Sequence, residues 1–411
     1  MKTKYLIIGN SAAAIGGVQG IRKVDKRSKI VLVADEPYST YSRPLISYWL
    51  EGRVDREHMV YRNPDFYRQY GVDTMLGTKV TAIDPAAHSV TTDSGKTITY
   101  EQLLIATGSN PFVPPIEGKE KAKNAFTFTT FDDAQGVKKA LKPDAKVVIM
   151  GGGLIGLKAA EALIDQVASL TIVDLADRVM PSVLDAEVAQ VMQQHLEDLG
   201  MELRLETSIK SVNSMSVTLS DGAKLPYDIL IFAVGTRPNQ ALAEAAGIDC
   251  ERGILTNESQ LTSAADVYAA GDCTQSHDIS ADVNRNIAIL PNAFMQGETA
   301  GINMAGGEAV FDKAFPINSM GIKDFYMLTA GSTEGQPQIV KTPDGIRKFY
   351  IAGDTLKGYM ILGECQRAGI YTDLIRQQTK LSTVDWESLA EAPKLAAFDV
   401  SVRKADLAQA H

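Results

Sequence analysis

The glycines between Val147 and Ala160 are the residues whose spacing most directly indicates chemistry. Gly151, Gly153 and Gly156 follow the order Gly-x-Gly-x-x-Gly after a run of apolar residues. The first glycine allows a sharp turn, the second lets the backbone approach phosphates, and the third brings a helix close to the strand. The N-terminus of that helix offers free N–H groups to an anion. The stretch therefore predicts a strand, a turn and a helix that bind the pyrophosphate of a dinucleotide.

An acidic residue strengthens this prediction. The apolar run at residues 170–173 predicts a second strand that ends at Asp174, close to the position about 20 residues after the last glycine where an acid binds the adenosine ribose. The negative charge of Asp174 favours NADH, because it repels the 2′-phosphate of NADPH. Leu154 and Ile155, which begin the helix, belong to the expected site. The alternative is a βαβ unit that binds no ligand.

The N-terminus repeats the same order of elements. Residues 4–8 predict a strand, and a helix rich in Ala and Gly follows through about Arg22. The next strand, at residues 30–33, leads to the acids Asp35 and Glu36, of which Glu36 is the expected ribose ligand. At the three positions that correspond to Gly151, Gly153 and Gly156, this N-terminal turn has Gly9, Ser11 and Ala14. Two such units predict two bound dinucleotides.

Composition limits the other possibilities. A chain of 411 residues predicts two or three domains. Hydrophobic residues make up 45% and charged residues 22% of the chain, as in ordinary globular proteins. The net charge of -9 argues against binding to nucleic acid or to an anionic membrane surface. No apolar run reaches the about 20 residues that span a bilayer, and the apolar residues near the N-terminus are expected to form a strand.

Cysteine and histidine spacing gives no sign of a metal site or a disulfide framework. Cys250, Cys273 and Cys365 are far apart in the sequence and form no Cys-x-x-Cys pair. The chain has five histidines and no His-Glu-x-x-His motif. We therefore expect no metal and reduced thiols, as in the cytoplasm.

The segment from Tyr41 to Gly52, with the acid just before it, carries a family resemblance. It resembles the flavin-contacting segment of the FAD-dependent pyridine nucleotide oxidoreductases, in the branch of rubredoxin reductases and nitrite reductase flavoproteins. The resemblance covers nearly the whole chain and implies that Arg43 and Pro44 contact the flavin. It implies an α/β fold with two Rossmann-like domains of the glutathione reductase type and a small α+β C-terminal domain.

Further motifs agree with this resemblance, in the family's order. One resembles the turn that leaves the FAD domain, and one the turn that closes the NAD domain. Another matches the second FAD signature, whose aspartate binds the ribityl chain, and the last is a helix aimed at the flavin pyrimidine edge. The first motif contains Ala106, Thr107 and Gly108, the second Val234 and Gly235, the third Gly271 and Asp272, and the helix Pro291 and Asn292.

The same motifs imply the division of the chain. Residues 1–112 and 241–312 are expected to form a discontinuous FAD-binding domain, and residues 113–240 the NAD-binding domain inserted into it. Residues 313–411 are expected to form the C-terminal domain, with a helix from Ala368 to about Lys380. The last stretch, residues 389–411, is expected to be a tail.

Three positions depart from the family's pattern. Thiol-using relatives carry a redox cysteine at the position of Pro44, so disulfide or sulfenic acid chemistry is disfavoured. Relatives commonly have Glu at the position of Lys158, near the nicotinamide. Lys158 is expected to belong to the cofactor site, and either to pair with an acid such as Glu161 or to alter nucleotide preference. Ferredoxin reductase relatives often have Lys at the position of Tyr48.

The expected function is transfer of electrons from NADH through FAD to rubredoxin or another iron–sulfur protein. The cofactors supply the bond making, so no acid–base pair is required. Two alternatives remain: an NADH oxidase that uses oxygen or a small oxidant, and an NADH-binding flavoprotein that acts as a slow sensor or scaffold. Docking of an acidic carrier would need local positive charge, for which the candidates are Arg43, Arg53, Arg56, Arg62 and Arg68.

Overall fold

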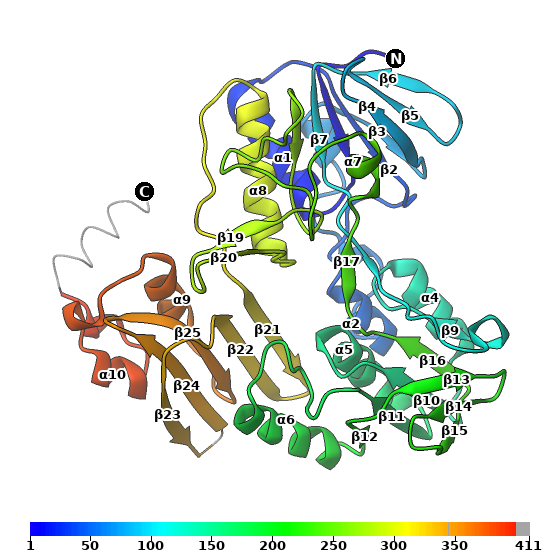
Figure 1. Cartoon of the computed structure of the whole chain (residues 1–411), viewed down its shortest axis with the longest axis vertical. Helices are drawn as coiled ribbons and strands as arrows, with labels where there is room; N and C mark the ends of the chain where they lie inside the picture. Colours follow the sequence, from blue (N-terminus) through cyan, green and yellow to red (C-terminus); the bar gives the residue numbers. More distant parts are fainter. Residues whose placement is uncertain (344, 400–411) are drawn as a thin grey trace.

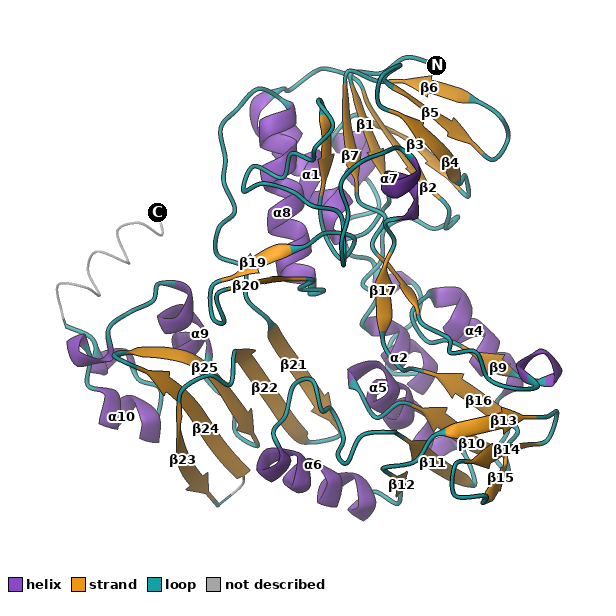
Figure 2. Cartoon of the chain, viewed as in Figure 1, coloured by secondary structure: helices purple, strands orange, loops and turns teal. Residues whose placement is uncertain are grey.

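The computed structural model describes residues 1–343 and 345–399. Figure 1 shows three groups of elements, with the N-terminal strands and α8 at the top, most elements from α4 to β16 at lower right with α6 at the bottom centre, and β21 to α10 at lower left. Figure 2 shows that the first two groups combine helices and strands, whereas the third is dominated by one sheet. Within the described ranges no helix is long and apolar enough to cross a membrane.

The first group is built on a parallel five-stranded sheet of order β18-β7-β1-β2-β3. The side chains of β1 and β2 are buried on both faces, which explains why these strands read as continuous apolar runs, whereas the edge strand β3 is partly exposed. Residues such as Ile7 pack on one face with two helices, and residues such as Leu6 pack on the other with a three-stranded sheet. The elements are β1 (Tyr5–Ile8), α1 (Ala12–Val24), β2 (Ile30–Ala34), β3 (Val72–Leu76), β4 (Val80–Asp84), β5 (Ser89–Thr92), β6 (Thr97–Thr99), β7 (Gln102–Ile105), β18 (Val267–Ala269) and α8 (Leu290–Met304).

The second group repeats this plan. Its parallel sheet has the order β12-β11-β10-β16-β9, with helices on one face and a three-stranded sheet on the other. The elements are β9 (Ala125–Phe126), α4 (Phe131–Ala140), β10 (Lys146–Met150), α5 (Leu154–Leu163), β11 (Ser169–Val173), α6 (Ala186–Asp198), β12 (Glu202–Arg204), β13 (Ile209–Val212), β14 (Ser216–Leu219), β15 (Lys224–Pro226) and β16 (Ile229–Phe232). The mixed α/β architecture with two such units agrees with the expected fold class.

Two short strands connect these groups. β8 (Ser109–Pro111) leaves the first group and β17 (Thr236–Pro238) returns to it, and the two pair antiparallel. The N–H of Phe112 donates to the carbonyl of Gly235 at 2.9 Å. The outgoing and returning chains therefore run side by side (Figure 1).

Helices α1 and α8 of the first group touch through glycines. A Cβ added at Gly297 would lie 1.9 Å from the carbonyl oxygen of Ala13, and one at Gly16 would lie 2.2 Å from the carbonyl oxygen of Phe294. Only glycine allows the two backbones to approach so closely. This contact fixes the N-terminus of α8 relative to the N-terminus of α1.

The third group is an antiparallel sheet of order β21-β22-β25-β24-β23. One face packs against α9 and α10, and the other shares a core with the second group, including Met192 of α6. The elements are β21 (Ile317–Ile322), β22 (Phe325–Gly331), β23 (Gln336–Thr342), β24 (Gly345–Ala352), β25 (Thr355–Leu362), α9 (Gly369–Arg376) and α10 (Trp386–Glu391).

Two expectations for the C-terminal region are wrong. The helix expected from Ala368 to about Lys380 ends at Arg376, and Lys380 instead forms a β-bridge with Thr355. The expected tail begins inside α10 rather than after the last helix, and Leu389 in it is fully buried because it packs against the outer face of the sheet. Residues 400–411 of that stretch lie outside the described residues.

Five further short elements belong to the described part of the chain. α2 (Leu45–Glu51) contacts α4 and α5 and lies in the expected flavin-contacting segment. The hairpin of β19 and β20 leads into α8 (Figure 2). The remaining bounds are α3 (Phe66–Gln69), α7 (Ala241–Ala245), β19 (Ser276–Asp278) and β20 (Val283–Arg285).

Candidate functional site: two nucleotide cradles

The turn between β1 and α1 forms the first cradle. Gly9 has φ +120, and a Cβ there would lie 2.1 Å from the carbonyl oxygen of Ala106, so the turn itself requires glycine. Ser11 is the N-cap of α1, and its side chain accepts no capping hydrogen bond. Ala14 is fully buried and packs in the core below the helix. The start of α1 is therefore left without a side-chain cap, next to the segment that follows β7.

Glu36 and Arg43 lie together beside this cradle. The guanidinium of Arg43 forms an ion pair with Glu36, and the hydroxyl of Tyr41 donates to the same carboxylate at 2.7 Å. Arg43 also donates to the carbonyl of Thr129 at 3.2 Å. Burial raises the pKa of Tyr41 well above its ordinary value, which keeps the phenol a hydrogen-bond donor. Pro44 follows as the exposed N-cap of α2.

The turn of Gly271 and Asp272 lies at the carboxyl end of β18. Gly271 has φ +87, and its N–H donates to the buried amide oxygen of Gln296 at 2.8 Å. Asp272 accepts a hydrogen bond from Ser109 at 3.2 Å. Burial raises the pKa of Asp272, while Ser109 and the charge of Arg43 favour its ionised form. Asp272 can therefore accept hydrogen bonds from ligand hydroxyls.

The start of α8 carries an unpaired donor. Asn292 has a relative exposure of 2%, and its Nδ2 has no hydrogen-bond partner among the described residues. A buried amide group without a partner is costly, so a ligand carbonyl here would relieve that cost. Pro291 precedes it within the first helical turn. This orphaned donor fits the pyrimidine carbonyl of a flavin, as does the free N-terminus of α8.

The segment after β7 closes this site. Ala106 is buried, and the hydroxyl of Thr107 donates to the carbonyl of Asn239 at 2.7 Å. Gly108 has φ +68, and its carbonyl accepts the N–H of Asn239 at 2.9 Å. These contacts hold the first connecting strand against the second at the edge of the cradle.

The turn between β10 and α5 forms the second cradle. A Cβ at Gly151 would lie 2.3 Å from the carbonyl oxygen of Ala233, and one at Gly156 would lie 2.0 Å from the carbonyl oxygen of Gly151. A Cβ at Gly153 would meet no protein atom within 4 Å. The fold therefore explains the first and third glycines, whereas the second fits a ligand that approaches the backbone.

Asp174 lies across from this turn. Its carboxylate accepts the N–H of Gly152 at 2.6 Å and the N–H of Ala176 at 2.8 Å. Val234 and Gly235 follow β16 at the same edge of the sheet, and Gly235 has φ +99. This position, outside the carboxyl ends of parallel strands, is where ligands bind in such sheets.

Helix α5 carries the remaining residues expected in the second site. Leu154 and Ile155 are half-buried at its first turn. Lys158 forms an ion pair with Glu161, donates to the carbonyl of Gly321 at 3.2 Å, and lies 4.4 Å from the centre of the Tyr48 ring. The pair with Glu161 is the arrangement suggested by the sequence, and it turns Lys158 toward α2.

The surroundings of the three cysteines do not favour a redox role. Cys273 is fully buried next to Asp272, and burial raises the pKa of its thiol. Cys250 and Cys365 are free thiols whose pKa values burial also raises. In the described part of the chain, no group of three or more His, Cys, Asp or Glu side chains is arranged to hold a metal ion.

Two residues at the first site were not predicted from the sequence. Gln296 holds the turn at Gly271, and Ser109 holds Asp272. Gln296 could have been noticed as a polar residue on the buried face of α8, beside Ala293 and Ala300. Ser109 carries no such signal, because hydroxyls are common in turns.

Both cradles lie in the part of the chain that matches a known protein family. Residues 3–297 match the family model described as pyridine nucleotide-disulphide oxidoreductase. The NADH-dependent phenylglyoxylate dehydrogenase subunit epsilon of Aromatoleum evansii is 28% identical over 92% of this chain and 93% of its own. The NADH oxidase of Methanocaldococcus jannaschii is 31% identical, covering 80% of this chain and 75% of its own.

Other relatives are reductases. The rubredoxin-NAD(+) reductase of Alcanivorax borkumensis is 31% identical over 66% of this chain and 72% of its own. The chain spans 48% of the longer nitrite reductase [NAD(P)H] of Bacillus subtilis, at 26% identity over 93% of this chain. Among solved structures, the covalent putidaredoxin reductase–putidaredoxin complex matches with a TM-score of 0.88 and 27% identity, over 95% of this chain and 96% of that one.

Proposed function

Because the chain belongs to the pyridine nucleotide-disulphide oxidoreductase family, we propose that it passes electrons from NADH through FAD to a small iron–sulfur carrier such as rubredoxin. The observation that carries the proposal is the presence of two glycine turns, each between a parallel strand and a helix N-terminus, in one chain. A reductase that uses two dinucleotides needs both.

The first cradle is the proposed FAD site. Asn292 and Asp272 would bind the pyrimidine edge and the ribityl chain, and Gly9 would admit the pyrophosphate. Ser11, Ala14, Glu36, Arg43, Pro44 and residues 106–108, 271 and 291 complete the proposed set. We propose residues 1–112 and 241–312 as the FAD-binding domain, which contains every strand of the first parallel sheet.

The second cradle is the proposed NADH site. Gly153 would admit the pyrophosphate and Asp174 would accept the adenosine ribose hydroxyls. We propose residues 113–240 as the NAD-binding domain, and residues 313–411 as the C-terminal domain. Asp174 supports a preference for NADH, because the exposed residue next to it is Leu175 rather than a cation.

The protein's part in the reaction is to bind, orient and exclude water. When bound, FAD supplies the group that accepts hydride and releases single electrons. Arg43 holds Glu36 in place, and Gln296 and Ser109 hold the turn at Asp272, so the polar groups facing the flavin are already oriented. Oriented reactants lower the barrier without an acid–base residue.

A protein acceptor fits better than a thiol or disulfide. Pro44 stands where thiol-using relatives carry cysteine, and the nearby Cys273 has no exposed surface. The free thiols support a reducing compartment, and we place the protein in the cytoplasm, where NADH is available.

Anaerobic titration with NADH, followed by an acceptor panel, tests the proposal. We expect fast bleaching of the flavin and fast reduction of rubredoxin or a ferredoxin. Fast oxygen uptake with slow carrier reduction would instead support the NADH oxidase alternative. Slow bleaching with a persistent charge-transfer band would support a sensor or scaffold.

A further inference from the structure

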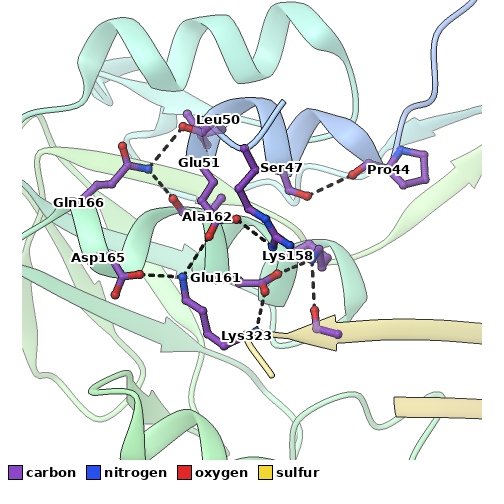
Figure 3. A network of polar contacts seen from close by, with 12 residues as sticks. Pro44, Ser47, Leu50, Glu51, Lys158, Glu161, Ala162, Asp165, Gln166 and Lys323 are labelled. Carbon is purple, nitrogen blue, oxygen red and sulfur yellow. Dashed lines mark hydrogen bonds and ion pairs between the residues drawn. The ribbon is translucent and has the colours of Figure 1, made fainter. Parts of the chain in front are cut away.

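Three parts of the chain that are distant in the sequence pack together: α2, α5 and the tip of the β21–β22 hairpin. We call the contact between them the seam. Figure 3 shows α2 and α5 side by side, with the tip of the β21–β22 hairpin against them. Gln166, which follows α5, donates to the carbonyl of Leu50 on α2 at 3.4 Å. α2 begins directly after Arg43 and Pro44, and α5 begins at the glycine turn of the second cradle. The seam therefore lies between the proposed flavin and nicotinamide elements.

Lys323 occupies the hairpin tip in a conformation that favours glycine. Its φ is +52, at the first position of the two-residue loop between β21 and β22. A left-handed conformation is unfavourable for a residue with a Cβ. The backbone N–H of Lys323 donates to Glu161 at 2.6 Å, and the Glu161 side chain is only 2% exposed. The strained turn is thus held by a buried carboxylate of α5.

The side chain of Lys323 makes contacts that a glycine at this position could not make. Its Nζ lies 3.1 Å from Glu51, at the end of α2, and 2.7 Å from Asp165, just after α5. The same ammonium group therefore joins both helices. The side chains of Lys323 and Glu51 are 22% and 18% exposed, so solvent screens this pair only in part, whereas Asp165 is 74% exposed and its pair is screened more strongly.

We propose that Lys323 is a positioning residue that fixes α2 against α5 and so sets the spacing across which hydride passes. The inference rests on the proposed function, because it assigns the flavin to α2 and the nicotinamide to α5. A misplacement of 1 Å can lower a rate by about 100-fold. A link that fixes two helices can therefore control the reaction without contacting the reacting atoms.

The test is Lys323→Met in the FAD-loaded protein, which removes the ammonium group and retains much of the side chain. We expect anaerobic flavin reduction at saturating NADH to slow by about tenfold, with the Kd for NADH changed less than about twofold. The charge-transfer absorbance between reduced flavin and NAD⁺ should weaken. Amide hydrogen exchange in α2 and in residues 321–326 should become faster.

Two variants serve as controls. Lys323→Arg retains the charge and should restore most of the rate and the absorbance band. Lys341→Met removes an exposed lysine from β23 of the same sheet and should leave every measurement unchanged. An unchanged reduction rate and band in Lys323→Met would overturn the proposal, as would a slower rate fully explained by lost FAD.

A double variant separates the link from a general loss of charge. Glu51→Gln removes one end of the link, and combined with Lys323→Met it should slow reduction no further than Lys323→Met alone. Additive effects would overturn the proposal. Failure of the wild-type flavin to be reduced by NADH would instead overturn the proposed function, so the two failures are distinguishable.

Discussion

Gly153 is a glycine that packing within the protein does not require, whereas a bound pyrophosphate would. Its neighbours Gly151 and Gly156 are explained by backbone oxygens that a Cβ would meet at 2.3 and 2.0 Å. At Gly153 a Cβ would enter open space. An Ala at this position should therefore disturb binding and leave folding intact.

We expect Gly153→Ala to retain FAD and thermal stability, while the Kd for NADH rises at least about tenfold, because the new methyl group occupies the approach of the pyrophosphate. Stopped-flow flavin reduction over a range of NADH concentrations measures this. Gly156→Ala is the comparison and should lose stability as well. Unchanged NADH affinity in Gly153→Ala would contradict the assignment of this cradle.

Lys158 shows how a local departure from the family's pattern is accommodated. The family resemblance implies Glu at this position and, in ferredoxin reductases, Lys at the position of Tyr48, and here the two positions are in contact. We expect Lys158→Glu to destabilise the protein by about 3 kcal/mol, because the buried Glu161 would lose its ammonium partner and gain a like charge. Adding Tyr48→Lys should recover much of the loss, since the new ammonium group would lie beside both acids.

Thermal unfolding of the wild type, Lys158→Glu and the double variant measures this recovery. Tyr48→Lys alone is the control, and it should be destabilising because it brings two ammonium groups together. A double variant no more stable than Lys158→Glu would show that an ammonium group at position 48 does not replace the one lost at position 158, and would contradict this prediction.

Sequence alone could predict the local part of both sites. The glycine turns and the acids after the next strands follow fixed spacings, and so does the pair of Lys158 with Glu161 on one helix. The contact of Lys158 with the carbonyl of Gly321 could not be predicted, because no local pattern relates residues so far apart. Lys323 was missed for the same reason.

At the scale of elements, the contact of α1 with α8 connects the start of the first cradle with the orphaned donor of Asn292. Gly297 and Gly16 allow the helices to touch. Any residue that separates the helices should therefore affect FAD binding as well as stability.

We expect Gly297→Ala to cost about 1 to 3 kcal/mol, because its Cβ would lie 1.9 Å from the carbonyl oxygen of Ala13 and the helices must move apart. FAD content after purification should fall with it. Gly369→Ala in α9 is the matched control, since a Cβ there meets nothing within 4 Å. Retained FAD and stability in Gly297→Ala would contradict the role of this contact.

The first residues of α6 and the C-terminal sheet are joined by a charge cluster. Lys348 of β24 lies 2.6 Å from Asp185, the N-cap of α6, and 2.9 Å from Glu187. Burial alone would raise the pKa of Asp185, but hydrogen bonds from Lys348 and Tyr350 hold it below 3.8. Burial alone would lower the pKa of Lys348, but hydrogen bonds to Asp185 and Glu187 raise it above 10.5.

The cluster predicts a pH window for stability. The contribution of Asp185 is complete above its unfolded pKa and is lost as the pH falls through its lower folded value. That of Lys348 is complete below 10.5 and is lost as the pH rises through its higher folded value. We expect Lys348→Met to cost about 2 kcal/mol between about pH 5 and pH 10.

Thermal unfolding from pH 3.5 to pH 10 checks this window. The difference between wild type and Lys348→Met should shrink on the acid side, and Lys341→Met should show no such dependence. A difference that stays constant down to pH 3.5 would contradict the role of Asp185.

Sequence patterns predicted elements better than the packing between them. Strands β1, β10 and β16 coincide with apolar runs in the sequence, because both faces of a parallel sheet are buried. The tail prediction failed because residues such as Leu389 are few and scattered among charges, and only the sheet supplies their packing surface. Helix α9 ended early because residues 378–380 turn back to pair with β25.

At the scale of the whole molecule, the proposed carrier, if acidic, would have to find local positive charge on a protein of net charge -9. Arg43, Arg53 and Arg68 are each paired with a carboxylate. Arg56 lies over the ring of Phe131, and Arg62 over the rings of Tyr61 and Phe294. Arg62 is thus the docking candidate nearest the start of α8.

We expect Arg62→Gln to raise the KM for rubredoxin by about threefold to tenfold at low salt and to have little effect at high salt, because steering by charge is screened. Flavin reduction by NADH should not change. Arg68→Gln, whose charge is already paired with Asp65, is the control. Equal effects of both variants would indicate general charge rather than a docking site.

The paired strands β8 and β17 have a consequence for protein engineering. Because the outgoing and returning chains lie hydrogen-bonded to each other, the segment between them can be regarded as a cassette with adjacent ends. Because this cassette holds the proposed NADH site, we expect that exchanging it for that of an NADPH-using relative would change the electron donor in a single transplant. Such a graft would need to keep Glu161 and Asp165, because the hairpin tip of the C-terminal sheet holds on to both.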